Sequence, residues 1–149
     1  GGIDAIITSG GSSSLNPQFM FKGPSLLPAL LKFEKNKIMR LILRLASPIM
    51  FRASEYNELY FLEQASRVKD AVKCKIIYVG GASTSKSFAK LMDSGFDFIQ
   101  LGRSLIAQPD LVNKAKSNLK FKSKCIHCNE CVGSIEYEGG VYCPLFNPK

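Results

Sequence analysis

Three short apolar runs, each closed by glycine, are the feature that most limits how this chain can fold. They are GIDAIITSGG (2–11), KIIYVGG (75–81) and GFDFIQLGR (95–103). Runs this short, rich in Ile, Val, Phe and Tyr, are typical of strands buried on both faces of a parallel sheet. The first and third also share the order Gly, apolar residue, Asp, a largely apolar run, Gly. The sequence therefore predicts three parallel strands.

Helical patterns separate and follow these runs. Apolar residues recur at spacings of three and four over 54–72, and a shorter helix is expected over 83–95, with Ser83 or Ser85 as its cap and Gly95 as its end. After Arg103, a turn through Pro109 leads into a further helix. Alternating strands and helices predict an α/β fold with right-handed crossovers.

Residues 12–53 interrupt this alternation. A loop-like stretch with Pro17, Gly23 and Pro24 precedes two apolar helical stretches, SLLPALLKF and NKIMRLILRLA. An insertion of this length between a strand and its helix commonly forms a lid or a binding element, and it can also simply cover a core. We expect residues 12–53 to form a lid within a domain spanning residues 1–119.

Composition bounds the class of protein. The 149 residues are 46% hydrophobic and 21% charged, as in one ordinary soluble domain, and a start inside a strand suggests a piece of a larger domain. We find no secretion signal, and the most apolar window, 38–51, is too short to span a bilayer, so a cytoplasmic protein is expected. The net charge of +8 comes from scattered lysines, with one modest cluster over 114–124, which favours a solvated surface over a nucleic-acid site.

The ends of the second and third runs predict a phosphate pocket. Ligands of α/β folds bind at the carboxyl ends of parallel strands, where Gly80, Gly81 and Gly102 let a ligand approach the backbone closely. Helices that begin after each loop add positive dipole ends, and Arg103 adds a fork of donors that suits two phosphate oxygens. The alternative is that the glycines only turn the chain and Arg103 pairs with a surface carboxylate.

Together the motifs resemble one enzyme family. The segments GIDAIITSGG, YFLEQASRVKDAV, KIIYVGGASTSKSFAKLMDSGFDFIQLGRSLIAQPDLVNKA and CIHCNECV are similar to the old yellow enzyme family, in its NADH:flavin oxidoreductase branch. The resemblance implies a partial TIM (β/α)8 barrel, approximately strands six to eight with their helices, that binds FMN. It assigns the FMN phosphate to Gly80, Gly81, Gly102 and Arg103. The family's proton-donating Tyr and its substrate-orienting His pair lie on earlier strands, so no catalytic residue is expected here.

A cysteine-rich tail, residues 120–149, follows this domain. Cys125, Cys128, Cys131 and Cys143 could ligate a [4Fe–4S] cluster or a structural zinc, or could be four reduced cysteines in a packed tail. The tail resembles that of dienoyl-CoA reductases, which carry three residues between the second and third cysteines, whereas this chain carries two. Cys74 stands apart near a strand start and is expected to be a small buried residue.

We expect these residues to belong to an FMN-dependent NAD(P)H oxidoreductase. It would transfer hydride from NAD(P)H through FMN to an electron-poor small-molecule acceptor, and this part alone would be inactive. The alternative from another class is a small basic module, stabilised by metal-bound cysteines, that contacts nucleic acid. A truncated product with no activity is a third possibility.

Overall fold

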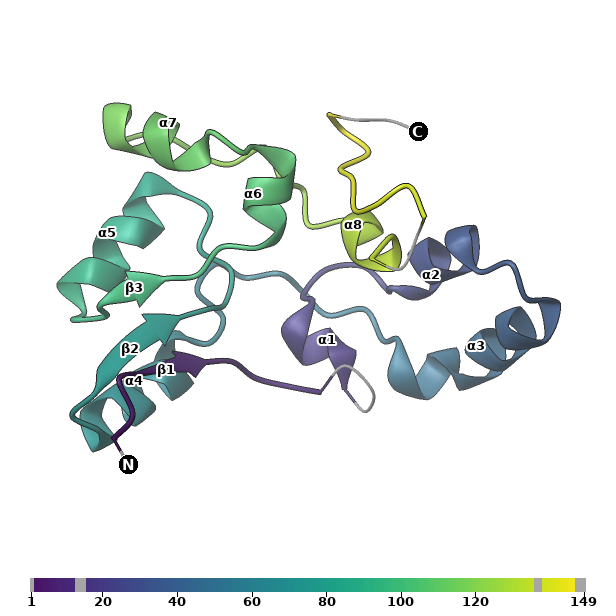
Figure 1. Ribbon diagram of the computed structural model, residues 1–149, viewed down its shortest axis with the longest axis horizontal. Coiled ribbons are helices and arrows are strands. Elements are labelled where there is room, and N and C mark those ends of the chain that lie inside the picture. The colour runs from purple at the N-terminus through teal and green to yellow at the C-terminus, as the bar shows by residue number, and fades with distance from the viewer. Residues whose placement is uncertain (1, 13–15, 136–137, 147–149) are drawn as a thin grey trace. The chain divides into compact units, whose positions relative to one another are not determined.

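The computed structural model describes residues 2–12, 16–135 and 138–146, and these fall into two compact units (Figure 1). The first unit comprises residues 2–10 and 57–124. The second comprises the described residues of 11–56 and 125–146. Each unit therefore combines segments that are distant in the sequence.

A parallel sheet forms the centre of the first unit. Its strands are β1 (Ala5–Thr8), β2 (Lys75–Tyr78) and β3 (Phe98–Ile99), which lie side by side in that order (Figure 1). Ile6 aligns with Ile76, and Ile77 aligns with Phe98. The parallel pairing predicted from the three apolar runs is confirmed, although the strands are shorter than those runs. The α/β class is thus established, and the TIM barrel stays a prediction.

Four helices accompany these strands among the described residues of the first unit. They are α4 (Leu62–Ala71), α5 (Ser85–Asp93), α6 (Arg103–Ala107) and α7 (Leu111–Ser117). Thr84 is the N-cap of helix α5, and its side chain forms a capping box with Ser87. The turn after the helix contains Gly95 at φ +82°. The cap was expected at Ser83 or Ser85 and is Thr84 instead.

The predicted helix over 54–72 was wrong for its first part, because α4 begins only at Leu62. Leu59 has φ +60°, in the left-handed region that a β-carbon disfavours. Its N–H donates to the carbonyl of Gly81 at 3.4 Å, and Glu58 accepts hydrogen bonds from Ser83. Contacts with the loop after β2 therefore replace helical hydrogen bonds in this segment.

The core of the first unit lies between the sheet and its helices. The buried hydrophobic side chains that form it are Ala65, Ile76, Tyr78, Ala82, Leu91 and Phe96. The rings of Tyr78 and Phe96 pack edge to face with centroids 5.3 Å apart. The hydroxyl of Tyr78 donates to the carbonyl of Gly80 at 2.7 Å, so the core directly supports the loop that follows β2.

Four helices also occur in the described part of the second unit. They are α1 (Pro17–Met20), α2 (Leu27–Phe33), α3 (Lys37–Met50) and α8 (Glu130–Gly133). The two apolar helical stretches predicted within 12–53 are confirmed as α2 and α3. A β-carbon on Gly133 would lie 2.6 Å from Ala29, so glycine allows α8 to pack closely on α2. Among the described residues, no helix has the length and apolar character needed to cross a membrane.

Candidate functional site

The loops that follow β2 and β3 leave the sheet at one edge. Because the two strands are adjacent and parallel, their carboxyl ends lie side by side. Gly80 and Gly81 follow β2 with φ +148° and +80°, conformations that glycine adopts without strain. Gly102 precedes α6, and Arg103 is the first residue of that helix. The structure thus places all four residues predicted for phosphate binding in two neighbouring loops.

Arg103 has a partner within its own unit, the phenol of Tyr60. The two side chains form a hydrogen bond. A guanidinium carries only donors, so the phenol oxygen of Tyr60 accepts. Burial raises the pKa of Tyr60 above its ordinary value of 10.0, while the charge of Arg103 and this hydrogen bond partly offset that increase. Tyr60 is therefore a neutral phenol at physiological pH.

The glycines of the two loops have different surroundings. A β-carbon on Gly81 would lie 2.8 Å from the ring of Tyr60, and one on Gly80 would lie 3.0 Å from the ring of Phe61. A β-carbon on Gly102 would meet no atom within 4 Å. The glycines after β2 therefore make room for the protein's own aromatic rings, whereas the space beside Gly102 is open to a ligand.

The N–H groups at the N-terminus of α5 were expected to point at a ligand, but they donate to other groups of the protein. The N–H groups of Ser83, Thr84 and Ser85 donate to Glu58, Ser87 and Phe121, respectively, at 3.0–3.1 Å. The Ser87 N–H donates to the Thr84 hydroxyl at 3.0 Å. These donors of the first turn are satisfied inside the unit. Of the groups predicted to bind phosphate at this edge, Gly102 and Arg103 are therefore the ones that this network does not involve.

Glu58 is held at this helix start by several hydrogen bonds. Its carboxylate accepts from the N–H and hydroxyl of Ser83 at 3.0 and 2.9 Å, and from the hydroxyl of Thr84 at 3.2 Å. Burial raises the pKa of Glu58, but hydrogen bonds from Ser87, Ser83 and Thr84 outweigh that effect and leave the pKa below its ordinary value of 4.5.

This lowered pKa predicts that acid loosens the contact between Glu58 and Ser83. The ionised carboxylate stabilises the fold above pH 4.5, and that contribution is lost as the pH falls through the folded-state pKa. The amide resonance of Ser83 should titrate with a midpoint below pH 4.5, as measured by NMR, and Glu58→Gln should abolish the titration. Glu55→Gln, on an exposed neighbour, is the control. A midpoint above 4.5 would contradict the assignment.

Sequence reasoning missed Glu58 and Tyr60. Both lie within the stretch 54–72 that was predicted to be helical, and neither was assigned a role at the candidate site. Their role depends on contacts with residues more than 20 positions away, namely Ser83, Thr84 and Arg103. No local pattern signals such contacts.

The structure does not bring the four tail cysteines together as metal ligands. Cys131 and Cys143 are buried, and the sulfur of Cys125 lies 3.8 Å from Nδ1 of His127, whose ring stacks on Tyr56. Over 2–12, 16–135 and 138–146, no group of three or more His, Cys, Asp or Glu side chains could hold a metal ion. The thiols as arranged do not fit a [4Fe–4S] cluster or zinc, and we assign no chemical step to a metal.

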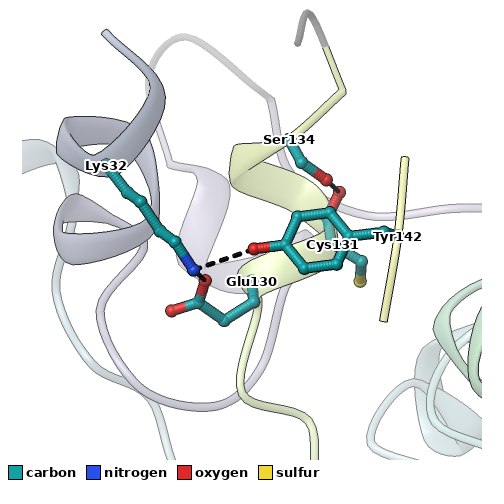
Figure 2. Close-up of polar contacts among 5 residues, drawn as sticks. All are labelled: Lys32, Glu130, Cys131, Ser134 and Tyr142. Atoms are coloured by element: carbon teal, nitrogen blue, oxygen red, sulfur yellow. Dashed lines mark hydrogen bonds and ion pairs between the residues drawn. The ribbon is translucent and has the colours of Figure 1, made fainter. Parts of the chain in front are cut away.

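Polar contacts hold the tail within the second unit (Figure 2). The ammonium of Lys32 on α2 lies 2.8 Å from the hydroxyl of Tyr142 and 3.3 Å from the carboxylate of Glu130. The hydrogen bond with Tyr142, and then that with Glu130, raises the pKa of Lys32. The hydroxyl of Ser134 donates to the carbonyl of Cys131 at 3.0 Å. These contacts tie the tail to α2 within the second unit.

An apolar cavity of about 590 Å³ lies within the second unit. Side chains from α2, α3 and the neighbouring segments line it, including Phe21, Leu26, Leu30, Leu43 and Phe51. Its volume falls in the range of small-molecule sites. Most of these lining residues belong to the stretch 12–53, for which a lid was predicted.

Three curated relatives of the chain are oxidoreductases by name. The chain is 31% identical over 135 residues to a 4,4'-dithiodibutanoate disulfide reductase of Rhodococcus erythropolis. This alignment covers 91% of this chain and 33% of that reductase. It is 32% identical over 94 residues to an NADH oxidase of Thermoanaerobacter brockii, an alignment that covers 61% of this chain and 14% of the oxidase. It is also 29% identical over 89 residues to a bilirubin reductase of Mediterraneibacter gnavus, which aligns with 58% of this chain over 14% of its own length. The chain thus spans a third or less of these relatives' lengths. No family model matches the chain, and no solved structure matches it significantly.

Proposed function

We propose that the protein is an FMN-dependent NAD(P)H oxidoreductase of the old yellow enzyme type and that these residues supply its FMN-phosphate site. The observation that carries the proposal is the pair of loops after β2 and β3, which leave one sheet edge and place Arg103 beside the open space at Gly102. The redox names of three curated relatives support the same class of reaction.

The residues of the two loops fit a phosphate better than other groups. A guanidinium binds phosphate oxygens through two parallel charge-assisted hydrogen bonds, and open space at Gly102 gives those oxygens access to the backbone. Gly80 and Gly81 would contribute indirectly, because they make room for the rings of Phe61 and Tyr60 beside the site. Bound FMN would supply hydride transfer between NAD(P)H and an electron-poor acceptor. The described residues would bind and orient its phosphate end.

The test is to purify the full-length gene product and measure its absorbance and NAD(P)H oxidation. We expect the two flavin bands, and faster NAD(P)H consumption when a quinone or an enone is added. A colourless protein that binds nucleic acid in a salt-sensitive manner would instead favour the basic binding module. A colourless protein with neither property would refute both functions.

We further propose that residues 12–53 act as the lid of the acceptor site, supported by the apolar cavity that they line. Phe21→Ala should raise the Michaelis constant for the acceptor several-fold, because Phe21 lines this cavity, and should leave FMN affinity unchanged. Steady-state kinetics and a flavin titration measure the two effects. Leu45→Ala on α3, whose side chain is 73% exposed, is the control. Loss of thermal stability without a kinetic change would show that the segment only covers a core.

A further inference from the structure

A five-residue segment, residues 57–61, contacts both loops of the candidate phosphate site. Glu58 binds Ser83 and Thr84, the N–H of Leu59 donates to Gly81, and Tyr60 binds Arg103. The segment precedes α4 and has no helical structure of its own. Its conformation is therefore fixed by these contacts, and the contacts in turn constrain the two loops.

Glu58 constrains the loop after β2. Its carboxylate accepts hydrogen bonds from both the N–H and the hydroxyl of Ser83, a residue that is only 5% exposed. Ser83 is also tied from the other side, since its carbonyl accepts from the N–H of Ser123 at 2.8 Å. With Ser83 fixed from two directions, the backbone two residues after Gly81 has little freedom to move.

Tyr60 constrains Arg103. The ring of Tyr60 packs against Gly81, and its hydroxyl accepts a hydrogen bond from Arg103. A guanidinium has five N–H donors in a rigid fork, so one phenol oxygen engages only part of it. A contact of this kind sets the orientation of the fork before a ligand arrives, which reduces the entropy lost on binding.

We propose that Glu58 and Tyr60 are positioning residues for phosphate recognition, in which Glu58 fixes the backbone after β2 and Tyr60 fixes the guanidinium of Arg103. This inference rests on the proposed FMN site. The opposite role would be competition, with the Glu58 carboxylate occupying donors that the phosphate needs. Positioning is favoured because Glu58 binds Ser83 and Thr84, whereas the open space lies on the other loop, at Gly102.

The experiment compares FMN with riboflavin, which lacks the phosphate, by flavin titration of the full-length gene product. The unmodified protein should bind FMN more tightly than riboflavin. Tyr60→Phe keeps the ring against Gly81 and removes the hydroxyl, and Glu58→Gln keeps the size and removes the charge. Each should weaken FMN binding by about two- to tenfold, as expected for a lost hydrogen bond, and leave riboflavin binding unchanged. Glu55→Gln, on an exposed residue just before the segment, is the matched control and should change neither.

Other outcomes would refute the positioning role and the phosphate site separately. Tighter FMN binding by Glu58→Gln would show competition instead of positioning. Equal losses for FMN and riboflavin, with a lower melting temperature, would show a purely structural role. Unchanged FMN affinity in both variants, with normal preference for FMN in the unmodified protein, would refute the positioning role and leave the phosphate site intact. An unmodified protein without any preference for FMN would refute the phosphate site and the positioning role together.

Discussion

Replacing Arg103 with alanine should weaken FMN binding by roughly ten- to a hundredfold. Loss of a charge-assisted, two-pronged hydrogen bond to phosphate costs on the order of 1.5–3 kcal/mol, which corresponds to that range. Arg103 begins α6 directly after Gly102, and the space beside Gly102 is open. Fluorescence titration of FMN into the apoprotein of the full-length gene product measures the effect.

Three controls make this result specific. Riboflavin affinity should not change, because riboflavin lacks the phosphate. Arg103→Lys should recover only part of the loss, since an ammonium keeps the charge but not the fork. Arg67→Ala removes an exposed arginine that pairs with Glu63 on α4, and it should have no effect. An unchanged dissociation constant in Arg103→Ala would refute the assignment of the phosphate site.

Local patterns predicted the secondary structure of the sheet and most helices correctly. Glycine-closed apolar runs yielded three parallel strands, because a short run of β-branched and aromatic residues has few other ways to be buried. Helix α3 could be recognised from its periodicity alone, although its apolar face remains largely exposed, with Ile38, Leu45 and Ile49 each more than 70% accessible. Periodicity thus reveals a helix without revealing what covers it.

The segment before α4 could not be predicted in the same way. Residues 54–61 have the apolar spacing of a helix, and the structure gives them another conformation because Glu58 and Tyr60 bind residues far along the chain. The candidate site could also be predicted only in part. Gly102 and Arg103 could be proposed because they follow a predicted strand. Tyr60 and Glu58, which bind Arg103 and Ser83, could not be proposed from the sequence.

The cysteine spacing was ambiguous for a related reason. Spacing along the chain shows which thiols could meet, but the backbone decides whether they do. His127 and Asn129 both have positive φ, +56° and +65°, and the buried side chain of Asn129 donates to the carbonyls of Phe21 and Pro24. These contacts direct the chain between Cys125 and Cys131 in a way that the spacing alone does not specify.

The two phenylalanines of the GFDF motif should respond very differently to truncation. In a regular strand Phe96 and Phe98 would face the same side, because side chains alternate with a period of two. In the structure Phe96 is 2% exposed and Phe98 is 52% exposed. The cause is Asp97, which exchanges two hydrogen bonds with Ile76: its N–H donates to the carbonyl at 3.0 Å, and its carboxylate accepts from the N–H at 2.8 Å. The carboxylate oxygen of Asp97 thus replaces a backbone carbonyl as the acceptor of the Ile76 N–H, and regular strand pairing begins only at Phe98.

Phe96→Ala should therefore lower the free energy of unfolding by about 3–5 kcal/mol, as for other buried phenylalanines, whereas Phe98→Ala should cost about 1 kcal/mol or less. Urea unfolding followed by circular dichroism measures both. Phe96 packs on Tyr78, whose hydroxyl holds the carbonyl of Gly80, so its loss should also weaken FMN binding. Equal destabilisation by the two substitutions would mean that Phe98 is buried as well, and would contradict the role assigned to Asp97.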